Sequence, residues 1–481
     1  MMNLFSAMLL GKDSLMTYQQ LFQMVGHNIA NVNTEGYSRQ IAELQSVPPE
    51  ALGYSSSGRG VDLQSIFAVR SQFINAQVVD KQQLQSRNDT LAEALSAVEA
   101  LFSEANDNGL SDSLGEFFSK WSDVANQPTD LATREEMIRN AQNLAARVSG
   151  SYQDLTVQQG LQNDKIGVLV DEINTIGHSI AALNVQITTA ENCGQEANDL
   201  LDERARLIRQ VSEKIGVNVN YEQSSGAATL TISNRPFVVG SEVNELSAIR
   251  DTTNSSYYDV HIATSSLSSV DITGEIANGE VGGLLAARDT VIPELKQQLD
   301  NLAYGLITHV NAIHQTGFAL DGTTTGQDFF VDFTPTAVGD YTGAAASLEV
   351  NPALVADATL LAVSATGAAG NNETALALAA LVNETDVVDA DNDGTADFGS
   401  FHDYLHSTYA WLGNQTSAAK NEADSYDTLL TNLDNNRDSI SGVSLDEEAS
   451  CLMQYQKTYN AIAQFISVVD GLTDTLLSIG T

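Results

Sequence analysis

Ser444-Leu445-Asp446-Glu447-Glu448-Ala449 opens a stretch that runs on to Ile479 and decides how this chain folds. Ser444 and Glu447 have the three-residue spacing of a capping box, which predicts the start of a helix. Apolar residues then recur at heptad spacing, which is typical of a helix that packs against a partner helix. They form two rows: Leu452, Tyr459 and Ile466 in one, and Tyr455, Ile462, Val469 and Leu476 in the other.

Residues 1–32 supply a matching helix at the other end of the sequence. Heptad spacing relates Met1, Met8, Leu15, Phe22 and Ile29, while Leu4, Tyr18, Val25 and Val32 form a second row. We therefore expect the two terminal helices to pair as a coiled coil and to pack against neighbouring subunits. The alternative is that these seams only hold one subunit together. The predicted assembly residues are Met8, Leu15, Phe22, Ile29, Leu452, Tyr459, Ile462, Ile466, Val469 and Leu476.

Composition argues against several classes of protein. The 481 residues include 62 acidic and 22 basic side chains, and the net charge of −40 disfavours nucleic acid and anionic membrane surfaces as partners. Cys193 and Cys451 lie far apart and lack the spacing of a zinc site or a disulfide framework. No apolar run approaches about 18 residues, so no membrane-spanning helix is expected. The N-terminal residues lack the features of a secretory signal peptide, so an exported protein would need another route.

Between the terminal helices, the spacing of apolar residues predicts further helices in two blocks. The predicted segments lie at about 84–102, 114–125, 130–190, 200–215, 285–316, 372–383 and 400–441. The segment at 130–190 far exceeds the usual helix length of about 11–12 residues, which indicates a rod or a bundle. Pro293 is expected either to start or to kink the helix that contains it.

Between 217 and 282 the apolar spacing changes to two, which predicts strands. Strands are expected at 217–221, 229–232, 237–239, 258–262 and 270–272, with another at 37–41 and short ones between 317 and 357. The predicted fold class is mainly α with inserted β. It comprises a terminal coiled-coil assembly domain (1–36 and 442–481), mobile in the monomer, an elongated helical bundle domain (37–216 and 283–441) and a small antiparallel β-domain at the surface (217–282).

Alternating carboxylates surround Gly394, at Asp389, Asp391, Asp393 and Asp397. Calcium needs several converging oxygen ligands, which this spacing can supply around a turn. An EF-hand loop would carry a bidentate glutamate at its twelfth position, where this chain has Ser400. Two interpretations stay open: a calcium site, or a solvated acidic turn in a protein without a cofactor.

A second constellation lies at the start of the following helix. His402 and His406 are spaced to share a helix face, and Asp403 stands where a zinc protease has its glutamate. This pattern keeps a metal-dependent hydrolase open as an alternative, although no third ligand is evident. His309 and His314 are five residues apart and fall on different faces of their helix. Histidines at the surface of a helix start are the simpler interpretation, so we expect no catalytic residues.

Two terminal motifs carry a resemblance to a known family. The first is Ala30-Asn31-Val32-Asn33-Thr34-Glu35-Gly36-Tyr37-Ser38-Arg39-Gln40, and the second is Ser441-Gly442-Val443-Ser444-Leu445-Asp446-Glu447-Glu448-Ala449, followed by Tyr455-Gln456. Both are similar to the signatures of flagellar rod, hook and hook-associated proteins. Internal motifs at 282–289, 301–314, 351–352 and 375–378 narrow the resemblance to the hook-associated branch, in the same order along nearly the whole chain.

The resemblance implies a structural adaptor of the bacterial flagellum, placed at the hook–filament junction. It implies export through the flagellar type III channel and assembly outside the cell. The implied partners are further copies of the chain in a ring or helical layer, hook protein below, a second junction protein above, and an export chaperone on the C-terminal helix. Another axial subunit, of the hook or filament type, is the main alternative.

Overall fold

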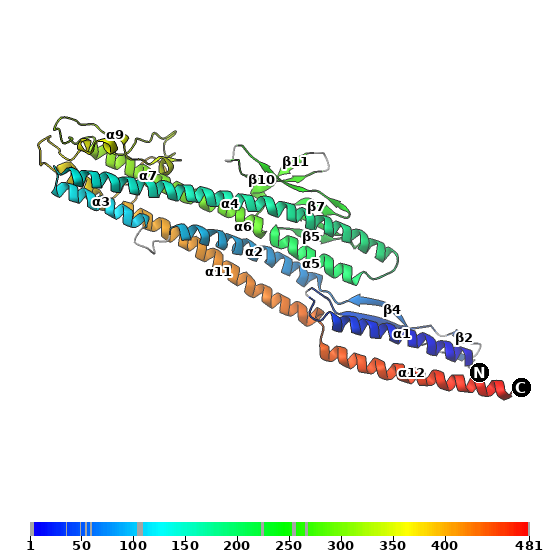
Figure 1. Cartoon of the computed structure of the whole chain (residues 1–481). Helices are drawn as coiled ribbons and strands as arrows, with labels where there is room; N and C mark the ends of the chain where they lie inside the picture. Colours follow the sequence, from blue (N-terminus) through cyan, green and yellow to red (C-terminus); the bar gives the residue numbers. More distant parts are fainter. Residues whose placement is uncertain are drawn as a thin grey trace.

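The computed structural model describes residues 4–34, 36–48, 50–52, 55–57, 60–102, 109–222, 226–252, 256–264 and 268–479. Long helices run along one axis and give the molecule an elongated shape, with both termini at the same end (Figure 1). Small antiparallel sheets lie beside these helices. The predicted fold class, mainly α with inserted β, is confirmed.

Seven helices build the rod, which is the elongated part of the molecule away from the termini. They are α2 (Gln72–Leu101), α3 (Leu110–Asn126), α4 (Leu131–Asn192), α5 (Asn198–Lys214), α6 (Gly279–Ala286), α7 (Ile292–His314) and α11 (Phe401–Ser441). The long helix expected at 130–190 is confirmed as α4, with 62 residues. Asp130 caps it, since its carboxylate accepts a hydrogen bond from Thr133 N at 2.9 Å.

Helix α4 also holds an 18-residue window that could cross a membrane by length and composition, the one such helix among the described residues. This window differs from the prediction that no helix is apolar enough over about 18 residues. Buried residues recur along the whole of α4, from Arg134 to Ile187, and pack into the protein. The window is 39% buried inside the protein, and the core helix of a globular protein can have the same length and composition.

Helices α6 and α7 form one continuous run, joined by a π-helical turn at Ala287–Val291. Helical structure therefore begins at Gly279, earlier than the expected 285. The apolar pattern missed this start because Gly279, Gly282 and Gly283 open the helix. Gly283 is needed for close packing on α2, since a Cβ there would lie 2.4 Å from the carbonyl oxygen of Arg87. Pro293 is the second residue of α7, so it lies at the start of that helix, just after the π-helical turn.

The described part of the rod contains two large hydrophobic cores, besides a small cluster of Ile74, Val78 and Leu430. The first joins α3, the first half of α4, α7 and the start of α11, and includes Trp121, Leu155 and Ile292. The second joins the later part of α4 with α5, α6 and the β-domain, and includes Ile166 and Leu285. Both α4 and the α6–α7 run pass through both cores.

A polar layer separates the two cores. On α4 it consists of Gln159, Gln162 and Asn163, and on the π-helical turn of Arg288, all of them buried. Gln159 Nε2 donates to the carbonyl oxygen of Arg288 at 2.7 Å. Arg288 donates to Asn163 Oδ1 at 3.1 Å and to the carbonyl oxygen of Tyr258 at 2.7 Å. These bonds tie the β-domain to the middle of the rod.

The β-domain consists of two antiparallel sheets that cover α4. The strand orders are β5-β6-β7-β8 and β11-β10-β9. The strands are β5 (Asn218–Tyr221), β6 (Ala228–Ile232), β7 (Arg235–Val239), β8 (Glu242–Val243), β9 (Leu246–Arg250), β10 (Tyr258–Ala263) and β11 (Ser269–Asp271). The five expected strands are confirmed within a few residues. Strands β8 and β9 were missed, β8 because it is only two residues long.

The segment between α7 and α11 corrects one expectation. Short strands were expected at 317–357, but within the described residues this segment forms only isolated bridges, such as Phe330 with Val350. Glycines with positive φ, among them Gly322 and Gly339, interrupt the extended backbone. The helices here are α8 (Ala344–Ser347), α9 (Pro352–Ala356) and α10 (Glu373–Ala380), with 3-10 turns at Ala358–Leu360 and Leu381–Asn383 and one earlier at Thr273–Glu275.

A hairpin connects the rod to the terminal helices. It pairs β1 (Gln40–Ser46) with β4 (Val61–Ala68), and the short strands β2 (Glu50–Leu52) and β3 (Ser55–Ser57) pair beyond it. The strand expected at 37–41 therefore begins later, at Gln40. The reason is that Ser38 binds Asp202 of α5 and Arg39 binds Glu448 of α12, so neither residue pairs as part of the strand.

Candidate assembly surface at the terminal helices

Helices α1 (Leu4–Ala30) and α12 (Leu445–Ile479) lie side by side and run in opposite directions (Figure 1). Their side chains interlock along the pair. Tyr18 lies edge-on to Tyr455 with ring centroids 5.9 Å apart, and Phe22 lies edge-on to Tyr459 at 6.0 Å. The helices approach each other closely at Gly11, because a Cβ there would lie 2.5 Å from Ile466 Cγ1.

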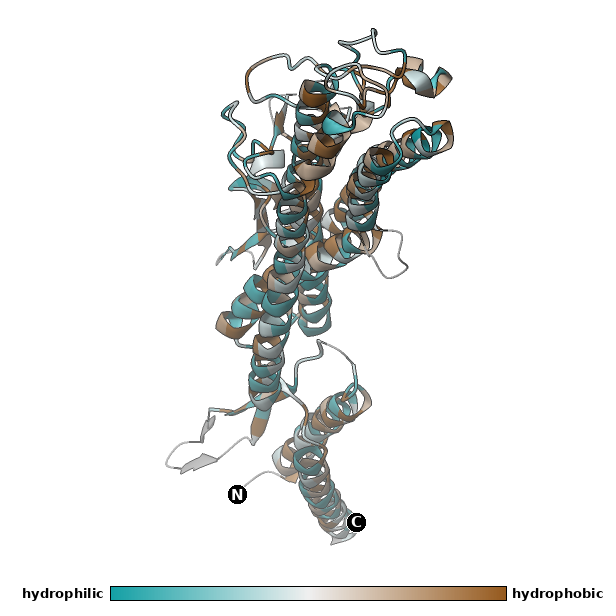
Figure 2. Cartoon of the chain, turned by 90° about the vertical axis from the view of Figure 1, so that its left-hand side faces the viewer, coloured by the Kyte–Doolittle hydropathy of each residue, from teal (hydrophilic) through white to brown (hydrophobic). Residues whose placement is uncertain are grey.

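The predicted assembly residues occupy different places on this pair. Phe22, Tyr459 and Ile466 lie between the helices, and Val469 is buried. By contrast, Met8, Leu452 and Leu476 are 40%, 37% and 57% exposed. Met1 lies outside the described residues, and Leu15, Ile29 and Ile462 are partly buried. Figure 2 shows hydrophobic and hydrophilic residues mixed along the helix that ends at the C-terminus.

A groove runs along one side of the helix pair, with a volume of about 510 Å³. Its lining is nearly all apolar and comes mainly from α1. It consists of Phe5, Met8, Leu9, Lys12, Leu15, Met16 and Gln19 of α1 with Tyr459 and Ile466 of α12. Large exposed apolar side chains on one face mark a surface that binds another molecule.

The two terminal sequence motifs contact each other where the helix pair meets the rod. Arg39 donates from Nε to Glu448 Oε1 at 2.7 Å and from Nη1 to Glu447 Oε2 at 2.5 Å. Its backbone N–H donates to the carbonyl oxygen of Ser441 at 2.8 Å. Glu448 is 1% exposed. Glu447 therefore binds Arg39, so only the serine half of the predicted capping box forms, with Glu447 N donating to Ser444 Oγ at 3.5 Å.

Asp202 of α5 fixes the same junction from the rod side. Its carboxylate accepts hydrogen bonds from Ser38 N at 3.0 Å, Ser38 Oγ at 2.9 Å and Arg70 Nε at 2.9 Å. On the side of the terminal helices, Asn28 of α1 forms two hydrogen bonds with the backbone of Gln40. Its Nδ2 donates to the Gln40 carbonyl oxygen and its Oδ1 accepts from Gln40 N, each at 2.9 Å. The motif at 30–40 thus links the terminal helices, the hairpin and the rod. Sequence reasoning did not find these partners.

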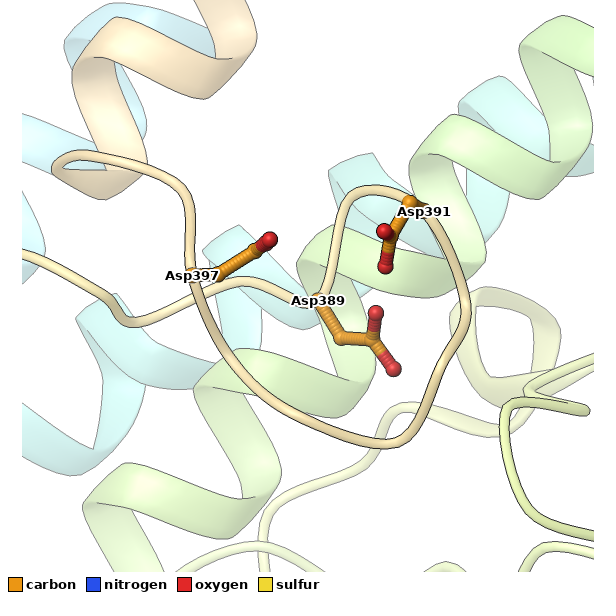
Figure 3. A group of neighbouring side chains, drawn as sticks. All are labelled: Asp389, Asp391 and Asp397. Atoms are coloured by element: carbon orange, nitrogen blue, oxygen red, sulfur yellow. The ribbon is translucent and has the colours of Figure 1, made fainter.

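The acidic loop brings three of its four candidate ligands together. Carboxylate oxygens of Asp389, Asp391 and Asp397 lie within 4.8 Å of one another, and their side chains converge inside the loop (Figure 3). Asp393 is not part of the group. The buried Asp389 accepts hydrogen bonds from Tyr341 OH at 2.5 Å, Asp393 N at 3.2 Å and Gly394 N at 2.8 Å. Both of its oxygens therefore already have donors.

The histidine constellation is organised as a helix cap. Asp403 accepts from Ser400 Oγ at 2.7 Å and from Ser400 N at 3.2 Å, while Asp403 N donates to Ser400 Oγ at 3.2 Å. This capping box begins α11 and occupies the carboxylate that a hydrolase would need as its base. The rings of His402 and His406 lie 6.4 Å apart. Among the described residues, the acidic loop supplies the only group of three potential metal ligands.

His314, the other notable histidine, is fully buried in the first core. Its Nδ1 lies 2.7 Å from the carbonyl oxygen of Gln327, and its Nε2 accepts from Ala362 N at 2.9 Å. Burial lowers the pKa of His314 to about 4, so the ring is neutral. Nδ1 then carries the proton, and the ring joins two loops of the core.

Comparison with known proteins identifies the family. Residues 95–330 match the helical domain of the flagellar hook-associated protein FlgK, and residues 436–479 match the C-terminal model of the flagellar basal body rod proteins FlgEFG. The chain belongs to the flagellar hook-associated protein 1 family. The resemblance stated from the terminal and internal motifs is thereby confirmed.

Members of this family match the chain over almost its full length. The flagellar hook-associated protein 1 of Bacillus subtilis is 27% identical over 504 residues, covering 97% of this chain and 96% of its own. The protein of the same name from Salmonella typhimurium is 27% identical and covers 96% and 97%. The solved structure of the flagellar hook junction protein FlgK from Burkholderia pseudomallei has the same fold. It superposes with a TM-score of 0.65 at 17% identity, covering 77% of this chain and 100% of that chain.

Proposed function

We propose that this chain is a structural adaptor of the bacterial flagellum, which polymerises at the hook tip and joins hook to filament. The observation that carries the proposal is the helix pair α1–α12, whose two sequence motifs are bonded through Arg39 and Glu448 and whose outer faces carry exposed apolar side chains. Its relatives are named for association with the hook, and the Burkholderia protein is named as a hook junction protein.

Assembly would work by packing of the terminal helices. The residues from 1–36 and 442–481 act as the assembly domain, the helical domain sets its orientation, and the β-domain faces outward. An isolated helix is marginal in water, so the helix pair gains most of its stability from tertiary contacts. We therefore expect both termini to be mobile in the free subunit and to order when neighbouring subunits cover them.

The partners follow from this placement. They are further copies of the chain in a ring or helical layer, hook protein below, and a second junction protein above. The chain would leave the cell through the flagellar type III channel, with an export chaperone bound to α12 beforehand. The exposed apolar residues of α12, such as Met453 at 57%, would be the surface that a chaperone shields.

Microscopy of cells that carry a labelled chain tests the proposal directly. The label is expected as one short zone at the hook tip, and a label spread along the filament would show a filament-type subunit instead. The variant Leu452→Asp should spare the rod, since Leu452 lies on α12 and is 37% exposed, yet abolish the junction. If cells with the Leu452→Asp variant carried as many filaments as cells with the wild-type chain, assembly through the terminal helices would be contradicted.

Limited proteolysis of the free protein tests the ordering of the termini. Residues 1–30 and 450–481 should be cut before the rod. Equal resistance of the termini and the rod would contradict ordering on assembly.

Two alternative functions, another flagellar axial subunit and a metal-dependent hydrolase, predict different experimental results. Another axial subunit, of the hook or filament type, would polymerise alone into long fibres. Members of this family are structural flagellar proteins, and we propose that this chain likewise has no catalytic activity. Stoichiometric zinc that is lost in His402→Ala would contradict that and favour the hydrolase.

A further inference from the structure

The helix pair carries two exposed apolar surfaces of different shape, apart from exposed residues near the start of α12 such as Leu452 and Met453. One surface is the groove on the α1 side, described above. The other is a ridge on α12, which we define as Phe465, Val468, Leu472 and Leu476. These four side chains are 40%, 62%, 52% and 57% exposed, and their spacing of three and four residues puts them in one stripe.

The ridge and the groove lie on different flanks of the pair. At 3.6 residues per turn, the ridge stands about a quarter of a turn around α12 from Ile462, Ile466 and Val469, the row that faces α1. Two residues of α12 wall the groove: Ile466, which belongs to that row, and Tyr459, which lies on the side of the row away from the ridge. One molecule therefore cannot place its own ridge in its own groove, whereas a second copy can.

The two surfaces are similar in length, and neither contains a carboxylate. The ridge spans about 17 Å and the groove about 21 Å along their helices, at 1.5 Å per residue. The chain has 62 acidic residues, yet none lies among the described residues that line the groove, and Lys12 is its single charged member. Identical copies that each carry a net charge of −40 repel one another, so a contact between copies needs a surface free of carboxylates.

We propose that the ridge of one subunit packs into the α1 groove of the next. This inference rests on the proposed function and names the contact by which the copies assemble. Because the ridge and the groove are different surfaces, the contact is heterologous. Each subunit then keeps a free groove on one side and a free ridge on the other, which produces a ring or a helical layer rather than a closed two-fold dimer.

Two substitutions of exposed residues separate the halves of the contact. Met16→Glu blocks the groove and Leu472→Glu blocks the ridge, and these residues are 55% and 52% exposed, so the subunit should still fold. Sedimentation velocity of the full chain is measured over a range of concentrations, with sulfate added to strengthen apolar burial. The wild-type chain should form a series of oligomers beyond the dimer, and each variant alone should remain monomeric.

An equimolar mixture of the two variants gives the decisive result. The Met16→Glu chain keeps its ridge and the Leu472→Glu chain keeps its groove, so the mixture should stop at one-to-one dimers. Val168→Glu, at a 60% exposed position on α4, adds the same charge elsewhere and should associate like the wild type.

Four results would overturn the contact: a monomeric wild type in sulfate, dimers of either variant alone, a monomeric mixture, or loss of association in Val168→Glu. Failure of this contact is distinguishable from failure of the proposed function. A labelled wild-type chain at the hook tip keeps the proposed function even when the mixture stays monomeric. A chain absent from the hook tip refutes that function whatever the sedimentation shows.

Discussion

Arg39 Nε and Glu448 Oε1 lie 2.7 Å apart although the residues are 409 positions apart in the sequence. The side chain of Glu448 is 2% exposed and that of Arg39 is 23% exposed, so the pair is largely removed from water. Each residue belongs to one of the two terminal motifs. The pair therefore fixes the start of α12 to the chain that leaves α1, at the point where the helix pair meets the rod.

Replacing Arg39 with alanine should loosen this junction. It leaves a buried carboxylate without its cation, which costs about 3 kcal/mol for a buried pair and somewhat less here because Arg39 is partly exposed. The loss should appear as faster hydrogen exchange in the first turns of α12. As a control, Glu447→Gln alters the 62% exposed partner and should cost less than about 1 kcal/mol. Equal effects of the two variants would contradict the role of burial.

The polar layer offers a matched pair of substitutions in the rod. Gln162 Oε1 is buried and accepts no hydrogen bond from the protein, so Gln162→Leu should raise the free energy of unfolding by about 1 kcal/mol. Gln159→Leu removes the donor to the Arg288 carbonyl oxygen. This variant should lower the free energy of unfolding by about 1–3 kcal/mol. Thermal unfolding of both variants checks these signs. The same sign for both would show that the layer is not held by specific hydrogen bonds.

Asp300 on α7 should make stability fall as pH rises from about 4 to 6. Burial raises the pKa of Asp300 to about 6, although backbone N–H groups of Ala345 and Gly343 lower it in part. Between these pH values the folded state holds a proton that the unfolded state has lost, so raising the pH favours unfolding. Asp300→Asn should gain on the order of 3 kcal/mol relative to the wild type between pH 4 and pH 7. A difference that does not change with pH would contradict the burial effect.

His314 should make stability rise as pH rises from about 4 to 6.5, which is the opposite of the effect of Asp300. Its pKa of about 4 in the folded state, lowered by burial, lies below the ordinary value of 6.5. The unfolded chain therefore binds more protons between these values, and stability is lost as pH falls. Relative to the wild type, His314→Gln should lose less stability between pH 7 and pH 4, as measured by denaturant unfolding. The variant with both substitutions should show the sum of the two effects.

The acidic loop should be held by hydrogen bonds rather than by calcium. Asp389 already accepts from Tyr341, Asp393 and Gly394, so Asp389→Asn should cost about 1–3 kcal/mol. Added calcium should leave the unfolding temperature of the wild type unchanged. A rise in that temperature that disappears in Asp391→Asn would instead establish a cation site at this loop.

Sequence reasoning succeeded where one local period decides the structure. The helix at 130–190 and the helix at 400–441 carry an apolar stripe over many turns, so their bounds were found within a few residues. Heptad spacing likewise pointed to pairing of α1 with α12. It could not show which flank of the pair stays free, because Leu476 fits the heptad row yet lies on the exposed ridge.

Contacts between distant segments were beyond the reach of local patterns. Short strands were expected at 317–357. Instead, Phe329, Phe330 and Val350 enter the first core from a backbone that forms only isolated bridges in this segment. Arg39 and Glu448 each look like ordinary surface charges in the sequence. The polar layer left a readable signal, since Gln159 and Gln162 replace apolar residues on the inward face of α4 between Leu155 and Ile166.

The unbroken course of α4 has a mechanical consequence. At 1.5 Å per residue its 62 residues extend about 93 Å, through both cores and the polar layer. The run of α6 and α7 crosses the same layer without a loop. Torque that enters at one end of the rod is therefore carried along hydrogen-bonded helices to the other end. We expect the rod to twist and bend as a single elastic shaft, with its greatest compliance at the π-helical turn beside Arg288.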